Sequence, residues 1–262
     1  MVTTAHSPSH PLTLFRLLLL LSVVIFQHAY ASAPPEAVGS LYLAKPKRYL
    51  CTATAVSGYD LGLSHSVAIL TAAHCIEPGL KKDTRSGTWI NTFDFNVSFD
   101  GKTFYEVEPY RVGYAESSYD IAVLLFTKNA PTVEPLQMGT WEQVDFGTDI
   151  QNFANPLGAG IQYFTGSVTM LYIEPAYVEK NPSWHQNAIA SLQVGPGSSG
   201  SLILNSDHEY VGVLSSVMEA RFGSPFTVFI PQWRFQEFMD NYSAGRTLAC
   251  ESCQLLTLFA AN

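Results

Sequence analysis

Residues 67–75 read VAILTAAHC, four apolar residues followed by a run of small residues that ends in His74 and Cys75. Val and Ile favour strands because their branched side chains pack well on a pleated surface. A tight turn at the end of a strand can present a side chain to a cleft. We therefore expect a strand over VAIL and place His74 at its end. On position alone, His74 is either a catalytic or a structural histidine.

Short runs of the same kind occupy the chain on both sides of this stretch. They are rich in Val, Ile, Thr, Phe and Tyr, and clusters of Gly, Pro, Asn and Ser separate them. They are VGSLYLA, CTATAVS, FDFNVSF, FYEVEPYRV and DIAVLLF, then DIQNFA, FTGSVTMLYI, NAIASLQV, SLILN, YVGVLSSV and FTVFI. About a dozen strands with turns between them indicate an all-β sandwich or barrel.

The run TVEPLQMGTWEQVDFG at residues 132–147 interrupts this pattern and divides the strands into two sets of six. We interpret it as the link between two β-barrels, one over residues 32–140 and one over 141–242. A helix should start at Pro231 and continue through WRFQEFMD, because its apolar residues leave one polar face. Residues 243–262 form a tail.

The first 31 residues have the pattern of a signal peptide. Arg16 precedes the apolar run LLLLLSVVIF at residues 17–26, and small residues follow at Ala29-Tyr30-Ala31. A membrane anchor is the alternative, but about ten apolar residues are too few to cross the hydrocarbon layer. We expect cleavage after Ala31, no stable membrane insertion afterwards, and a secreted or periplasmic protein.

Charge and cysteine content restrict the function further. The chain has 14 Lys and Arg against 22 Asp and Glu, a formal net charge of −8, which does not favour binding to nucleic acid or to an anionic membrane. Four cysteines in an exported chain can form disulfides in three pairings. The C-x-x-C motif of Cys250 and Cys253 also occurs in redox and metal sites, but no second Cys/His cluster lies near it in the sequence.

Three polar residues together match the needs of amide hydrolysis, which requires a nucleophile, a base, an acid that orients the base, and donors for the oxyanion. His74 lies in TAAHC, Asp120 opens the strand DIAVLLF, and Ser199 lies in GPGSSGS, whose glycines permit close backbone approach. Alone, each also fits an ordinary role: a structural histidine, a turn-capping aspartate and a loop serine.

The order His, Asp, Ser in TAAHC, the Asp-Ile-Ala-Val strand start and the Gly-x-Ser-Gly turn closely resembles the trypsin/chymotrypsin-like serine peptidases. The resemblance extends from about Val38 to the helix ending near Tyr242. It implies two six-stranded antiparallel β-barrels with a C-terminal helix. It also implies an endopeptidase that cleaves a protein or peptide substrate through an acyl-enzyme on Ser199, with no metal or organic cofactor.

The same resemblance implies a role for each site residue. His74 would be the general base and acid, Asp120 would orient it, and the backbone N–H groups of Gly197 and Ser199 would form the oxyanion hole. Ser215 would give the aspartate a further hydrogen bond.

Specificity is the next implication. Gln193 would lie at the base of the substrate pocket, and residues 215–217 and Pro225 along its walls. Gln193 is neutral and Val217 is branched, so we expect a small or medium uncharged side chain to bind there. Glu219 is the alternative source of a negative charge.

The resemblance also pairs Cys51 with Cys75, which leaves Cys250 for Cys253. One departure from the digestive members is Ser198, which stands where they have an aspartate that pairs with the new N-terminus after zymogen cleavage. Together with the few cysteines and the runs ANPLGAG and TGSVT, this indicates a bacterial-type enzyme that needs no such activation.

Two other classes of function remain to be weighed. A catalytically silent binding module could use the same fold. An α/β-hydrolase esterase needs a G-x-S-x-G elbow between a strand and a helix and the order Ser, acid, His, and neither the helix content nor the order fits. His185 and His208 are interpreted as loop histidines, and Met218, Glu219 and Arg221 as a surface loop rather than substrate contacts.

Overall fold

The computed structural model describes residues 35–82, 89–113, 119–174, 184, 186–218 and 226–243. The chain separates into one unit of Met1–Pro35 and one of Glu36–Asn262, and every described element belongs to the second. The expected signal peptide, the pair Cys250 and Cys253, and most of the expected tail lie outside the described residues. Within them, every helix is too short or too polar to cross a membrane.

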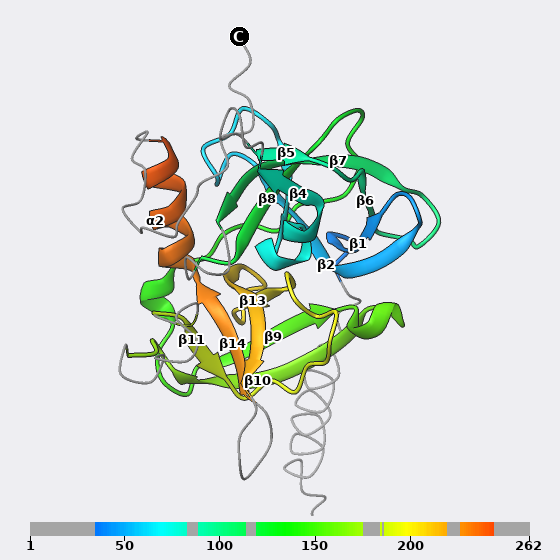
Figure 1. The fold of residues 1–262 in the computed structure, drawn as a ribbon. Helices are drawn as coiled ribbons and strands as arrows, with labels where there is room; N and C mark the ends of the chain where they lie inside the picture. The colour runs from blue at the N-terminus through cyan, green and yellow to red at the C-terminus, as the bar shows by residue number, and fades with distance from the viewer. Residues whose placement is uncertain are drawn as a thin grey trace, which may run out of the picture. The chain divides into compact units, whose positions relative to one another are not determined.

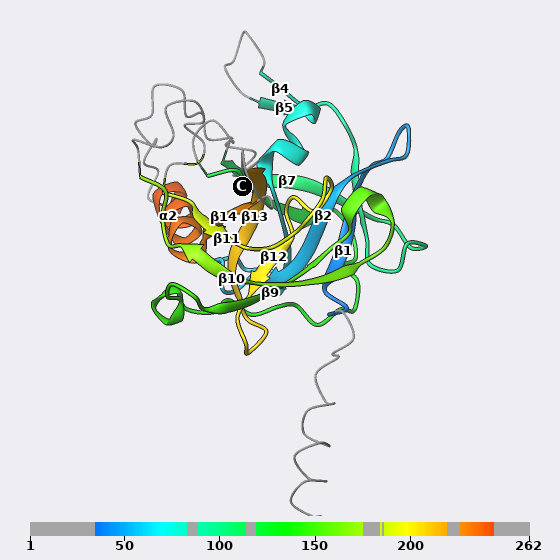
Figure 2. The same ribbon diagram turned by 90° about the horizontal axis from the view of Figure 1, so that it is seen from below.

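The first six-stranded sheet closes into an antiparallel barrel (Figure 1). Its strands, in spatial order, are β1 (Val38–Leu43), β2 (Arg48–Ser57), β3 (Val67–Thr71), β8 (Ile121–Phe126), β7 (Tyr105–Gly113) and β6 (Phe95–Ser98). Two short strands, β4 (Leu80–Lys82) and β5 (Trp89–Asn91), pair with each other apart from this barrel (Figure 2).

The second barrel is also closed and antiparallel. Its spatial order is β10 (Gln162–Met170), β11 (Ala188–Ala190), β14 (Phe226–Pro231), β13 (Tyr210–Met218), β12 (Leu202–Leu204) and β9 (Asp149–Ala154). Helix α2 (Gln232–Ser243) follows β14 directly, so Pro231 ends a strand rather than starting the helix. The expected fold, two six-stranded antiparallel barrels and a C-terminal helix, is confirmed.

Side chains alternate between the two faces of each strand, so each barrel buries one set inside and offers another outside. Separate clusters of apolar side chains fill the two barrels. A third cluster joins the outer faces of both barrels to α2; its larger members are Leu70, Ile121, Phe153, Leu202, Tyr210, Ile230, Phe235 and Phe238. Burial of each such side chain stabilises the fold by about 1.5–3 kcal/mol, so this cluster is a major part of the contact between the barrels.

Helix α2 also packs on the chain that leads into β8. The ring of Phe238 is fully buried, with its centroid 5.5 Å from that of Tyr119. A Cβ at Gly113 would lie 3.1 Å from the same Phe238 ring. Tyr119 immediately precedes Asp120, so the helix supports the backbone that carries this carboxylate.

Phe238→Ala should lower the free energy of unfolding by about 3–5 kcal/mol, because it leaves a cavity between α2 and the first barrel. Urea denaturation measures the loss. Asp240→Ala, on the exposed side of the same helix, is the control and should change the free energy by less than about 1 kcal/mol. Equal effects of the two substitutions would show that α2 is not held by this contact.

Candidate active site

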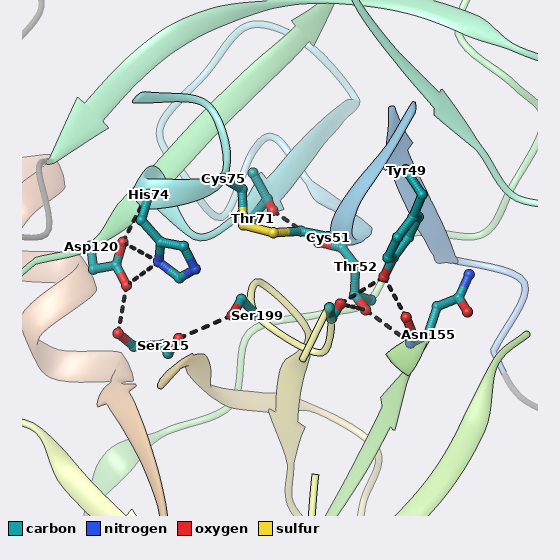
Figure 3. Close-up of a disulfide and its surroundings, with 11 residues drawn as sticks. Tyr49, Cys51, Thr52, Thr71, His74, Cys75, Asp120, Asn155, Ser199 and Ser215 are labelled. Carbon is teal, nitrogen blue, oxygen red and sulfur yellow. Dashed lines mark hydrogen bonds and ion pairs between the residues drawn. A yellow bond between two sulfur atoms is a disulfide. The ribbon is translucent and has the colours of Figure 1, made fainter. Parts of the chain in front are cut away.

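Asp120 is a buried carboxylate, 2% exposed, at the entrance to β8. The backbone N–H of His74 donates to its Oδ1 at 2.9 Å, and His74 Nδ1 lies 3.0 Å from Oδ1 and 2.9 Å from Oδ2 (Figure 3). The Ser215 hydroxyl donates to Oδ2 at 2.5 Å, as the resemblance implied. Three donors from two barrels therefore compensate one buried charge.

The backbone of Asp120 is in the left-handed region, with φ at 40°. A non-glycine residue there is uncommon and is retained where the surrounding contacts determine it. Here the contacts are the three hydrogen bonds to the carboxylate and the packing of Tyr119 on Phe238.

His74 lies in a single 3-10 turn, η1 (Ala73–Cys75), directly after β3. Burial alone lowers its pKa, because an imidazolium is poorly solvated there. The hydrogen bond that the ring donates to Asp120 and the negative charges of Asp120 and Glu77 more than offset this, so the pKa of His74 lies above its usual value. The environment of the ring therefore favours its protonated form.

Ser199 lies in a tight turn in which Gly197 and Gly200 cannot be replaced without a clash. Gly197 and Gly200 have φ of 91° and 82°. A Cβ at Gly200 would lie 2.3 Å from Thr71 Oγ1 and 2.6 Å from the Thr52 carbonyl oxygen. The backbone of the turn therefore packs directly against the first barrel, the barrel that carries His74.

The hydroxyl of Ser199 donates to the backbone carbonyl of Ser215 at 3.2 Å. It makes no hydrogen bond to His74 in the described structure, although both residues line the same pocket (Figure 3). To act as a nucleophile with His74 as its base, the Oγ must leave this carbonyl and turn toward the ring. Such bonds often tighten only when substrate is present.

The backbone N–H groups of residues 197–201 fall into two sets. Those of Ser198, Gly200 and Ser201 donate to carbonyl oxygens of the protein. Those of Gly197 and Ser199 have no acceptor among the described groups. They are the two N–H groups that the resemblance assigns to the oxyanion hole.

A pocket of about 540 Å³ opens beside Ser199. It is lined by His74, Asp120, Trp184, Val194, Gly195, Pro196, Ser199, Leu214, Ser215, Ser216 and Val217. Its only titratable lining residues in the described part are His74 and Asp120, which are bonded to each other. The other described residues that line the pocket are neutral.

The pocket agrees only in part with the residues expected to form it. Ser215 and Val217 line it, but Gln193 is exposed and is not among its lining residues. Trp184 lines it and was not anticipated, because a single Trp in a polar stretch carries no local pattern. Pro225, Glu219, Arg221 and His185 lie outside the described residues. His208 is half-exposed in a turn, and Met218 packs against a small buried cluster around Ile173.

Ser198, beside the candidate nucleophile, is fully buried, and its hydroxyl has no hydrogen-bond partner in the described structure. A neutral hydroxyl cannot hold a charged N-terminal amine as a carboxylate would. No ion pair is therefore available at this position to switch the turn between two forms.

The disulfide of Cys51 and Cys75 lies next to His74 and joins β2 to η1, as the resemblance implied. The two Cα atoms are 6.1 Å apart across 24 residues of sequence. One ligand atom each from Cys51, His74 and Cys75 lies within 4.8 Å of the others, but the two sulfurs are bonded to each other. Neither is a thiolate that could bind a metal.

The chain is similar to known peptidases in both sequence and fold. The model of the trypsin-like peptidase domain matches residues 51–213. No curated protein sequence matches the chain. Similar solved structures include the HtrA-type protease AlgW with a decapeptide (15% identity, TM-score 0.59, 80% of this chain and 65% of that one) and AlgW with a tripeptide (17%, 0.58, 79% and 60%).

Another is an inactive mutant form of Rv3671c from M. tuberculosis H37Rv, at 15% identity and TM-score 0.56, covering 82% of this chain and 90% of that one. The present chain spans less than two thirds of the length of the AlgW chains. At these identities the likeness establishes a common fold.

The ionisation of His74 gives a direct test of the hydrogen bonds around Asp120. The ring should titrate above about 6.5, the usual pKa of histidine, because the charged form is stabilised by the carboxylate. Asp120→Asn should lower that pKa, since it removes the charge and leaves the burial. Proton NMR of the imidazole between pH 5 and 9 measures both, with His74→Gln to assign the signal. An unchanged pKa in Asp120→Asn would contradict this account.

Proposed function

Since the chain belongs to the trypsin-like peptidase family, whose model covers more than half of it, we propose that it is a serine endopeptidase with Ser199 as nucleophile. The single observation that carries the assignment is the joint placement of a buried carboxylate, a paired imidazole and a hydroxyl around one pocket. Three such groups come together around one pocket by chance far less often than a single polar residue occurs in one.

The proposed reaction begins when Ser199 Oγ leaves the Ser215 carbonyl and transfers its proton to His74. The Oγ bonds to the scissile carbonyl carbon, and the carbonyl oxygen becomes an oxyanion that the N–H groups of Gly197 and Ser199 stabilise. The imidazolium, stabilised by Asp120, returns the proton to the leaving amine. Water then attacks the acyl-enzyme with His74 again as base, and the acid product and Ser199 are released.

Substrate selection is proposed to depend on the neutral pocket beside Ser199. A Lys or Arg side chain there would be desolvated without a free carboxylate among the described lining residues, because Asp120 already accepts three hydrogen bonds. Val217 and Trp184 narrow or cap this space with apolar surface. Small or medium uncharged side chains on the acyl side of the scissile bond fit it best.

Export is proposed from two features. Residues 1–31 have the sequence pattern of a signal peptide. The bridge of Cys51 and Cys75 requires an oxidising compartment to persist. Both point to a secreted or periplasmic enzyme.

A silent binding module is the second candidate function. The observation in its favour is the hydrogen bond that holds Ser199 on Ser215 rather than on His74. A fluorophosphonate probe separates the two proposals, because it reacts only with an activated serine.

The probe should label the wild-type protein, and Ser199→Ala and His74→Ala should remove labelling and peptide cleavage by several orders of magnitude. Ser198→Ala is the matched control: it removes a neighbouring hydroxyl of the same turn that has no bonding partner, and should label normally. Wild-type protein that folds but resists the probe would favour the binding module.

Peptides that differ only on the acyl side of the scissile bond test the pocket. Values of kcat/KM for Ala, Val or Leu should exceed those for Arg and Lys by at least about 10-fold, because the cation has no carboxylate to pair with. A preference for Arg or Lys would contradict a neutral pocket and would direct attention to Glu219.

A further inference from the structure

Tyr49, at the start of β2 in the first barrel, bonds to two loops of the second barrel. Its hydroxyl contacts the backbone carbonyl of Gly197 at 2.7 Å and the backbone carbonyl of Asn155. Its ring lies against both turns, because a Cβ at Gly158 or at Gly197 would approach it within 3.0 Å and 2.9 Å. Figure 3 shows Tyr49 and Asn155 on the side of Ser199 opposite to Asp120 and Ser215.

Thr52, on the same strand, holds the same two loops. Its backbone N–H and its hydroxyl donate to the Gly197 carbonyl at 2.9 and 3.0 Å, and its hydroxyl accepts the N–H of Asn155 at 2.9 Å. Asn155 in turn donates from Nδ2 to Ser40 Oγ on β1 at 2.6 Å. The side chains of Tyr49, Thr52 and Ser40 in the first barrel thus all bond to Asn155 in the second.

The peptide bond before Gly197 is held as well. The N–H of Leu157 donates to the Pro196 carbonyl at 2.8 Å, and Leu157 adopts a left-handed φ of 58° to do so. In a trans peptide the C=O and N–H groups point in opposite directions. Bonding the Pro196 carbonyl to Leu157 therefore turns the Gly197 N–H away from that turn, where it has no acceptor in the described structure.

We propose that Tyr49 is a positioning residue for the oxyanion hole: its hydroxyl joins the 155–158 turn to the 195–200 turn, and so fixes the direction of the Gly197 N–H. Tyr49 is not among the residues that line the pocket, and its hydroxyl bonds to Asn155 and Gly197 rather than to Ser199. It acts through the two backbone carbonyls that it bonds. This inference rests on the proposed peptidase function and adds a residue that the motifs do not include.

The chemistry of the side chain suits this task. A phenol has one proton to donate, and the backbone carbonyls of Asn155 and Gly197, which can only accept, share it here. Burial raises the pKa of Tyr49 to about 12, partly offset by the hydrogen bond with Thr52. The hydroxyl therefore stays a donor across the whole pH range in which His74 changes charge.

Tyr49→Phe removes only the hydroxyl. We expect kcat to fall about 10-fold with KM within about twofold, because loosening an oxyanion donor should cost less than the 10²–10³ of losing one. Tyr42→Phe is the matched control. It makes the same change on the paired strand, with ring centroids 5.7 Å apart, and should leave both constants unchanged.

Two inhibitors separate an effect on oxyanion stabilisation from an effect on general substrate binding. A peptide aldehyde bonds its carbonyl carbon to Ser199 Oγ, the serine proton passes to His74, and the resulting oxyanion needs the Gly197 N–H. A reduced analogue with CH₂ in place of the carbonyl needs no such donor. Tyr49→Phe and Thr52→Val should each weaken the aldehyde about 10-fold and leave the affinity of the reduced analogue unchanged.

The outcomes are distinct. Wild-type rates and inhibitor affinities in Tyr49→Phe would overturn the positioning role while leaving the peptidase assignment intact. Equal weakening of both inhibitors, with a lower Tm, would also overturn it, because the role would then be structural. Wild-type protein that neither cleaves peptides nor reacts with the fluorophosphonate would reject the peptidase function and this inference together.

Discussion

The buried carboxylate of Asp120 is the constraint on which the site depends. An uncompensated charge in the interior costs several kcal/mol, so its oxygens must find donors. Those donors are the backbone and ring of His74 from the first barrel and the hydroxyl of Ser215 from the second. One charge therefore specifies how the η1 turn and β13 lie relative to each other, and the neighbouring Ser199 takes its place within that arrangement.

The other half of the site is determined by backbone rather than by charge. Gly200 lies so close to Thr71 and Thr52 that any side chain would displace the first barrel. The carbonyl groups of Pro196 and Gly197 are both occupied, by Leu157 and by Thr52 and Tyr49. Among the backbone N–H groups of residues 197–201, those of Gly197 and Ser199 have no acceptor in the described structure. The carbonyl groups of this turn thus bond within the protein, whereas these two N–H groups are the donors that the proposed mechanism assigns to the oxyanion.

The sequence was sufficient for the elements that carry a local signal. Runs rich in Val, Ile, Thr, Phe and Tyr between turn residues predicted the strands of both barrels, and the surroundings of His74, Asp120 and Ser199 predicted residues that the structure brings together. Trp184 was not predicted because a single Trp in a polar stretch carries no local pattern. Tyr49 was not predicted because its hydroxyl bonds to residues 106 and 148 positions away in the sequence, and no local periodicity reveals such contacts. Gln193 was placed from a count of residues and does not line the described pocket, because the turn that precedes Ser199 decides which side chains face it.

The packing of α2 on Tyr119 has a consequence for the order of assembly. Each barrel is a continuous stretch of chain, so the first can close as soon as β8 has been synthesised. The backbone that carries Asp120 nevertheless gains its support from Phe238, in the last described element. A nascent chain that has completed both barrels but not α2 still lacks this support. If the proposed peptidase function holds, the complete site forms only after this last described helix has been synthesised.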